Sequence, residues 1–156
     1  MCSFGCIVAE LFTGIPLFPG ESEREQMSLL LEVLDVPSSE VLDMSPFAHK
    51  FFDNHGVAYI MDNIKGERKK CGAKPLWQIL DCDDWNFLSF VSHCLDWNPN
   101  TWYTPDQALR HIWILEGLPK NVLYHHCKMY EIAPSEVPPL LLAGTGLENQ
   151  WIWSKH

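Results

Sequence analysis

The sequence predicts a mainly α-helical domain whose helices are joined by long loops. Residues 3–14 combine helix-forming and apolar side chains and end in a glycine, which commonly stops a helix. Residues 27–34 and 87–95 repeat apolar side chains at intervals of three and four, the period of a helix with one buried face. A Thr-Pro pair at residues 104–105 is a strong signal for the start of another helix.

The composition is that of a folded chain with little attraction for polyanions. The 156 residues are 47% hydrophobic and include 7 Trp, which indicates a core rather than disorder. The formal net charge of −9 favours neither nucleic acid nor an anionic membrane, because both attract clustered Lys and Arg. We interpret the short basic run at residues 65–74 as a solvated loop. No apolar run approaches the ~20 residues that a membrane-spanning helix needs.

The cysteines indicate reduced thiols and hence an intracellular protein, cytoplasmic or nuclear. They follow no CxxC spacing and no secretory signal precedes them. Cys6 and Cys94 stand in apolar helical settings and are expected in the core. Residues 125–127, His-His-Cys, lack the second ligand pair that a structural zinc site needs, so we expect no metal site. The thiols are Cys2, Cys6, Cys71, Cys82, Cys94 and Cys127.

The first helix, at residues 3–14, is apolar on nearly every side. Glu10 is its only acid, so we expect a helix that is buried all round. Residues 16–20 follow it and contain two prolines and a glycine, which prevent the helix from continuing.

The second helix begins in an acidic turn. Ser22 is the expected N-cap, and Glu25 three positions later is its capping-box partner. Apolar side chains in residues 27–34 would form the buried face. Glu21, Glu23 and Glu25 are candidates for docking a basic peptide. We favour the plainer interpretation, that these acids cap the helix and keep its surface polar.

The middle of the chain is rich in loops. We expect a short helical piece around residues 40–44, a turn at 51–56 and a brief extended stretch at 57–60. Residues 76–80 would make one helical turn or two. Asp83 or Asp84 would then cap a convincing third helix, whose apolar face is formed by Phe87, Leu88, Val91, Cys94 and Leu95.

The fourth helix starts at Thr104, with Gln107 completing a capping box, and closes at Trp113 and Ile114. Residues 115–156 show no helical period and are punctuated by prolines and glycines. We expect an irregular tail there, either poorly structured or docked back on the domain. The predicted organisation is therefore a helical domain at residues 1–114 and a tail at 115–156.

Residues 3–20 resemble the central helix of the protein-kinase C-terminal lobe and the loop that follows it. Sequences of that family carry the motif Asp-x-Trp-Ser-x-Gly-Cys, followed by Glu-Leu-x-x-Gly-x-x-Leu-Phe-Pro-Gly. Further segments resemble the dual-specificity tyrosine-regulated (DYRK) kinases. They are residues 26–37, the Phe-Phe-Asp-x-x-Gly at 51–56, the basic run after Gly66, and the closing motifs at 94–99 and 104–114. The resemblance covers about residues 1 to 119.

The resemblance implies a mainly α, partial kinase C-terminal lobe, made of the helices after the activation segment, with the N-terminal lobe and the catalytic loop absent. It implies structural roles for the residues of the matching motifs: Gly5, Glu10, Leu11, Pro16, Phe18, Trp97, Pro99 and Trp113.

Three departures from the family pattern stand out. Cys2 occupies the position of the motif tryptophan. Residues 46–48, Pro-Phe-Ala, replace a segment that is usually small-Arg-Arg. Trp102 replaces an arginine that, in whole kinases, pairs with the glutamate of the Ala-Pro-Glu motif.

Phosphoryl transfer in this family uses ATP and Mg²⁺ held by a glycine-rich loop, a lysine on the third strand, His-x-Asp-x-x-x-x-Asn and Asp-Phe-Gly. None of these occurs in the sequence. The acids at residues 81–84 cluster at a helix start, where capping explains them. We therefore expect no catalytic, cofactor-binding or metal-binding residue in this chain.

Three hypotheses for function follow. The first is a truncated kinase domain that is inactive alone and binds a protein partner at a first-helix groove or at the second helix. The second is a fragment of a complete ATP-dependent serine/threonine (dual-specificity) kinase whose catalytic part lies upstream. Trp102 argues against the second, since losing one partner of a buried ion pair costs about 3–5 kcal/mol. The third is a decayed gene whose product has no function.

Stability bears on the first hypothesis. In the family, apolar side chains of the first helix contact the catalytic loop and its neighbouring helix. Leaving about half of five such large side chains unburied would forfeit roughly 4–8 kcal/mol, at ~1.5–3 kcal/mol each, against a total stability of ~5–15 kcal/mol for a whole domain. We expect the isolated chain to be marginally stable and to expose an apolar groove along its first helix.

Overall fold

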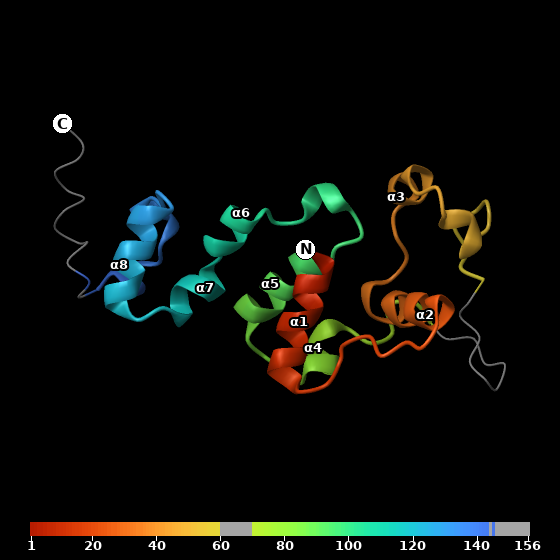
Figure 1. Cartoon of the computed structure of the whole chain (residues 1–156), viewed down its shortest axis with the longest axis horizontal. Coiled ribbons are helices and arrows are strands. Elements are labelled where there is room, and N and C mark those ends of the chain that lie inside the picture. The colour runs from red at the N-terminus through yellow and green to blue at the C-terminus, as the bar shows by residue number, and fades with distance from the viewer. Residues whose placement is uncertain (60–69, 144, 146–156) are drawn as a thin grey trace. The chain divides into compact units, whose positions relative to one another are not determined.

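The computed structural model describes residues 1–59, 70–143 and 145, and its regular elements are helices, as predicted (Figure 1). In these ranges the extended pairing is limited to an isolated antiparallel bridge between Phe52 and Ala58. No helix in them is long and apolar enough to cross a membrane. The chain divides into two compact units, unit 1 at Met1–Trp102 and unit 2 at Tyr103–His156.

Unit 1 is built from helices joined by irregular segments. In chain order the elements are α1 Cys2–Thr13, α2 Glu23–Leu34, α3 Ser39–Met44, the 3-10 helix η1 Ala48–Lys50, α4 Leu76–Leu80, α5 Trp85–Leu95 and the 3-10 helix η2 Pro99–Thr101. Each predicted helix of residues 1–102 is present. The extended stretch predicted at 57–60 reaches into residue 60, which lies outside the described residues, as do residues 65–69 of the basic run at 65–74.

Local signals set the ends of α1 and α5. Gly14 adopts the left-handed conformation with φ of 76°, and its N–H donates to the carbonyl of Glu10 at 2.7 Å. Of the two aspartates proposed as the cap of α5, Asp84 is the one used. Its carboxylate accepts hydrogen bonds from the N–H groups of Asn86 and Phe87 at 2.9 and 3.0 Å.

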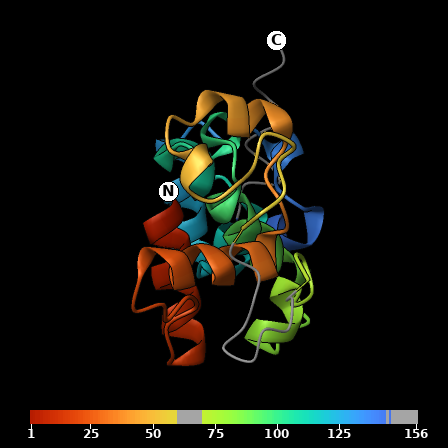
Figure 2. The ribbon, with the colours of Figure 1, turned by 90° about the vertical axis from the view of Figure 1, so that its right-hand side faces the viewer.

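One core of unit 1 lies where α1 packs along α5 (Figure 1, Figure 2). Gly5 and Ala9 are the buried residues of α1. A Cβ built on Gly5 would lie 2.8 Å from the Cβ of Cys94, closer than real Cβ contacts allow. The glycine therefore sets how closely the two helices approach. Farther along α1, the rings of Phe12 and Phe87 lie 4.6 Å apart.

A second core of unit 1 joins the end of α2 to the segments that follow α3 and α5. Leu31, Phe52 and Ala58 are buried there, with Trp97 packed against them. A segment near Gly72 closes the side of this cluster, since the Gly72 N–H donates to the carbonyl of Leu31 at 2.9 Å.

Unit 2 differs from the prediction of one helix over residues 104–114. The start is confirmed: the Thr104 hydroxyl accepts from the Gln107 N–H at 3.2 Å, and the Gln107 side chain accepts from the Thr104 N–H at 2.8 Å. However, α6 Pro105–Leu109 ends early and α7 Ile112–Gly117 begins anew. The break comes at His111, whose extended backbone and ring Nδ1, 3.2 Å from the N–H of Trp113, make it the N-cap of α7.

The irregular tail expected at residues 115–156 is contradicted over much of its described length. It contains α8 Lys120–Met129, the 3-10 helix η3 Pro134–Glu136 and α9 Pro139–Leu142. These elements share a core, which includes Leu115, Leu123, Cys127, Ile132 and Val137. Helix α8 was missed because only Leu123 and Cys127 are fully buried on it, too few for a visible period.

Candidate docking surfaces

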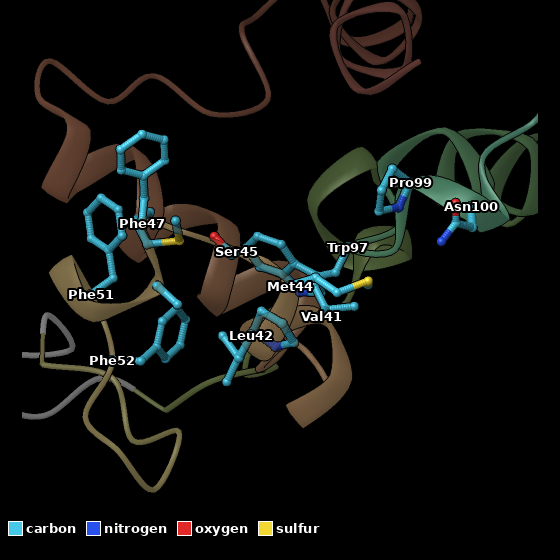
Figure 3. Close-up of a pocket in the computed structure, with 13 residues that line it drawn as sticks. Val41, Leu42, Met44, Ser45, Phe47, Phe51, Phe52, Trp97, Pro99 and Asn100 are labelled. Atoms are coloured by element: carbon cyan, nitrogen blue, oxygen red, sulfur yellow. The ribbon is translucent and has the colours of Figure 1, made fainter.

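A pocket of about 510 Å³ opens between α2, α3, η1 and the segment after α5. Its lining is mostly apolar. Figure 3 shows Phe47, Phe51 and Phe52 on one side and Pro99 and Asn100 on the other. The lining residues are Met27, Pro37, Val41, Leu42, Met44, Ser45, Phe47, Ala48, Phe51, Phe52, Trp97, Pro99 and Asn100.

The floor of the pocket is fixed while its rim is open. Phe52 is only 5% exposed and belongs to the second core. Trp97 is half-buried, and its indole Nε1 donates to the carbonyl of Asp35 at 3.0 Å, which ties the floor to the end of α2. Met44 and Phe47 stand at the rim with 59% and 61% of their surfaces exposed. The pocket is therefore an apolar hollow that an incoming side chain could fill.

Sequence reasoning singled out Trp97 and Pro99 but did not bring them together with α3. The available signal was the departure at residues 46–48, where the family usually writes small-Arg-Arg. Phe47 now lies on the pocket rim, with the Lys50 Nζ 5.1 Å from its ring centroid. Because Phe47 stands where the family usually has an arginine, this part of the pocket rim is apolar.

A second apolar surface runs along α1, and it corrects the expectation that this helix is buried all round. Phe4, Ile7 and Leu11 are spaced i, i+3 and i+7 and form one stripe, here called the α1 stripe. Their exposed fractions are 44%, 54% and 81%. The buried side of the helix, through Gly5 and Ala9, faces the other way. Apolar side chains are thus exposed along the first helix, as expected, while a groove at this helix stays a prediction.

The motif residues predicted to be structural fall into different settings. Gly5 and Phe18 are buried, and Trp97 and Trp113 are half-buried. The exposed motif residues are Glu10, Leu11, Pro16 and Pro99. The structure brings Trp97 and Pro99 into one pocket, and it places Gly5 and Leu11 on opposite sides of α1.

Ser22 and Glu25 form the cap at the start of α2. The Ser22 hydroxyl accepts from the N–H of Glu25 at 3.2 Å, and the Glu25 carboxylate accepts from the N–H of Glu21 at 3.0 Å. The expected capping box is therefore present in altered form, because the carboxylate bonds the residue before the cap. Glu21, Glu23 and Glu25 are all exposed, and their role in docking a basic peptide stays a prediction.

Two thiols meet on the first turn of α1. Cys2 and Cys6 are both partly exposed, and their side chains are hydrogen-bonded to each other. That bond lowers the pKa of Cys2 to about 6, against the opposing effect of burial and with a smaller contribution from the Met1 amino group. The same bond raises the pKa of Cys6, as do burial and the charges of Cys2 and Glu10. Burial also raises the pKa values of Cys94 and Cys127.

The residues described by the structure contain no group of three or more His, Cys, Asp or Glu placed to hold a metal ion. In the His-His-Cys segment, the Nε2 of His126 lies 2.8 Å from the carbonyl oxygen of Leu109, and Cys127 is buried in the core of unit 2. These two side chains therefore contribute to the packing of unit 2.

No family model matches the chain. It is 42% identical over 111 residues to the dual specificity tyrosine-phosphorylation-regulated kinase 2 of Drosophila melanogaster. This match covers 71% of this chain and 15% of the relative. It is 43% identical over 114 residues to kinase 4 of the same name from Homo sapiens, covering 73% and 22%. It is 42% identical over 109 residues to the DYRK-family kinase pom1 of Schizosaccharomyces pombe, covering 70% and 10%.

The chain spans between 10% and 22% of the length of these relatives. The matches agree with the helices found in residues 1–102 and with the motifs that resembled a kinase C-terminal lobe. The chain therefore belongs to the DYRK family of protein kinases and corresponds to part of the kinase C-terminal lobe.

Proposed function

We propose that this DYRK-family segment acts by binding another protein and transfers no phosphate by itself. The observation that carries the proposal is the α1 stripe, in which Leu11, one turn beyond Ile7, is 81% exposed. Contiguous exposed apolar side chains of this size are uncommon on a free protein surface and mark interaction sites.

The α1 stripe is held in place from behind. The opposite side of α1 packs on α5 through Gly5 and Ala9, and the edge-to-face rings of Phe4 and Phe90 lie 6.2 Å apart. A partner would therefore meet a helix already fixed in position, so less conformational entropy is lost on binding. The exposed Glu10 beside the stripe and the net charge of −9 favour a partner whose apolar face is flanked by basic residues.

The pocket, which α2 and α3 help to line, offers a second place where an apolar side chain of a partner could bind. Its volume and its open rim suit one or two bulky side chains of a partner. The pocket supports binding at the second-helix region by geometry that does not depend on the acids at Glu21, Glu23 and Glu25.

An alternative function is favoured by the comparisons. The relatives are protein kinases of which the chain spans a minor part, so the segment could serve as a piece of a complete ATP-dependent serine/threonine (dual-specificity) kinase. In that case the α1 stripe would be covered within the same polypeptide. The indole of Trp102 donates to the carbonyl of Asp96 at 2.6 Å, which is a different interaction from an arginine–glutamate pair.

Two measurements separate these functions. Residues 1–156, incubated with labelled ATP, Mg²⁺ and a basic peptide, should transfer no label, and transfer above that of a boiled sample would contradict the proposal. Peptide-specific detection of residues 88–114 in the source cells gives the mass of the natural product. A kinase-sized product would favour the alternative.

A further inference from the structure

We propose that Ser45 is a phosphorylation site for a proline-directed protein kinase, and that the phosphate closes the pocket to apolar side chains. Kinases of this class phosphorylate a Ser or Thr that directly precedes a proline, and Ser45 precedes Pro46. Ser45 also lines the pocket, where Figure 3 shows it among the apolar side chains. The proposal goes beyond the proposed function and does not rest on it, because both the modification and its effect on the pocket are measured without a partner.

The local backbone presents Ser45 to solvent. Proline disfavours the helical conformation in the residue before it, and Ser45 accordingly ends α3 with an extended backbone, at φ of −91° and ψ of 115°. Pro46 then occupies the second position of a turn that the Ala48 N–H closes by donating to the Ser45 carbonyl at 3.2 Å. Ser45 and Pro46 are both exposed. A kinase that binds its substrate in an extended conformation therefore has one short turn to open here.

Thr104, which precedes Pro105, is the internal comparison because its hydroxyl is already used. That hydroxyl accepts a hydrogen bond from the Gln107 N–H at 3.2 Å, and the Gln107 side chain accepts from the Thr104 N–H at 2.8 Å. Pro105 begins α6, so a kinase would have to break this capping box and unwind the first turn of the helix. We expect phosphorylation at Thr104 to be at least about fivefold slower than at Ser45, which is the typical effect of losing such a cap.

The Ser-Pro pair comes from one of the departures from the family pattern. Pro46 is the first residue of the Pro-Phe-Ala segment, which replaces the usual small-Arg-Arg. The same segment places Phe47 on the pocket rim, with 61% of its surface exposed. The apolar rim and the Ser-Pro pair are therefore both features of this changed segment.

The transfer balances with ATP as the co-reactant, held by the separate kinase. The Ser45 hydroxyl oxygen attacks the γ-phosphorus, the bond from that phosphorus to the β,γ-bridging oxygen breaks, and ADP leaves. The hydroxyl proton passes to the catalytic carboxylate of the kinase. Phosphoserine carries a charge of about −1.5 to −2 near pH 7, so the modification adds a strongly hydrated anion to the lining of the pocket.

The charges near Ser45 favour a phosphate that stays in water at the pocket opening. Asp43 is exposed on α3, and Ser45 follows the C-terminal end of this helix, where the carbonyl groups carry partial negative charge. The Nζ of Lys50 lies 5.1 Å from the ring centroid of Phe47 on the rim. Attraction of Lys50 toward the phosphate would bring a second charged group to the opening. An apolar side chain that enters must then remove water from charged groups, which costs free energy.

The first measurement locates the phosphate. The full chain is incubated with ATP, Mg²⁺ and a proline-directed kinase, such as a cyclin-dependent kinase, and modified peptides are followed over time by mass spectrometry. Phosphate should accumulate on Ser45 at least about fivefold faster than on Thr104. Ser45→Ala should remove this product, and Pro46→Ala should remove it while keeping the hydroxyl. Thr104→Ser keeps both the cap and the proline, so this control should leave the rate at Ser45 unchanged.

The second measurement asks whether the phosphate closes the pocket. Indole, a neutral probe of the size of an aromatic side chain, is titrated into the full chain labelled with carbon-13 on its methionine methyl groups. Met27 and Met44 line the pocket, whereas Met129 is an exposed residue of α8 in unit 2. Indole should shift the NMR signals of Met27 and Met44 and leave that of Met129 in place. Phosphorylation of Ser45 should weaken this affinity at least about fivefold, the lower end of the cost of desolvating a polar group.

Ser45→Ala is the control for the kinase treatment, because its indole affinity should be the same before and after incubation. Circular dichroism of each variant checks that the helices remain. Three results would overturn the proposal: no phosphate on Ser45, equal rates at Ser45 and Thr104, or indole binding at Met27 and Met44 that is absent or is unchanged by phosphorylation.

Discussion

The indole Nε1 of Trp97 donates a hydrogen bond to the carbonyl oxygen of Asp35 at 3.0 Å, across 62 residues of sequence. This bond joins the segment after α5 to the end of α2, and the same indole lines the apolar pocket. Asp35 has a φ of 63°, which is costly for a residue with a side chain, so the hydrogen bond helps to hold the α2 terminus in that conformation.

Trp97→Phe should destabilise unit 1 modestly. The change keeps most of the packing on the second core but removes the hydrogen bond, whose net contribution is about 0.5–1.5 kcal/mol. Urea unfolding followed by circular dichroism measures the loss. Trp77→Phe is the matched control, because Trp77 is 52% exposed on α4. Equal stabilities for the two variants would contradict a role for the Trp97–Asp35 bond.

Gly5→Ala should destabilise the packing of α1 on α5. The new Cβ would lie 2.8 Å from the Cβ of Cys94 and 3.1 Å from the Cδ2 of Leu95, and such overpacking costs about 1–3 kcal/mol. Gly117→Ala is the control, since a Cβ there meets no atom within 4 Å. Thermal unfolding should therefore separate the two variants, and an unchanged melting temperature for Gly5→Ala would be inconsistent with the close approach of the helices.

Leu11→Asp should abolish partner binding and leave stability nearly unchanged. The side chain is largely exposed, and surface substitutions usually change stability by less than about 0.5 kcal/mol. Ala9→Asp places the same charge on the buried side of α1 and should unfold the helix packing. If both variants destabilised the chain equally, the assignment of an exposed and a buried side to α1 would be wrong.

The reactivity of Cys2 should depend on pH with a midpoint near 6. The thiolate is the reactive form, so alkylation of Cys2 by iodoacetamide should be fast above pH 6 and fall as the pH drops below it. Cys6→Ala removes the hydrogen-bond donor and should move the midpoint upward, toward the ordinary thiol value. Peptide mapping of alkylation between pH 5 and 9 measures both curves, and coincident curves would exclude the hydrogen bond as the cause.

Much of unit 1 could be predicted because its helices carry local signals. The glycine after α1, Ser22 before α2 and Asp84 before α5 each fix a helix end within a few residues of sequence. The start of a helix depends on such short-range hydrogen bonds, so sequence reasoning succeeds there.

The pocket and the folded tail could not be predicted, because both depend on contacts between distant residues. The pocket needs Trp97 to meet α2 and α3, and the core of unit 2 needs Ile132 and Val137 to cover the two buried residues of α8. The two apolar sides of α1 look the same in sequence. Only the position of α5 decides that Ala9 is buried and Leu11 is exposed.

The most direct test of the central claim is photo-crosslinking from the α1 stripe. A benzoylphenylalanine at position 11, expressed in the source cells, should give an adduct with a separate protein, identified by mass spectrometry. The same probe at Gln78, an exposed position on α4, should not give it, and Phe4→Asp with Ile7→Asp should remove it. An adduct confined to the chain's own polypeptide, or one equally strong from position 78, would contradict binding at the α1 stripe.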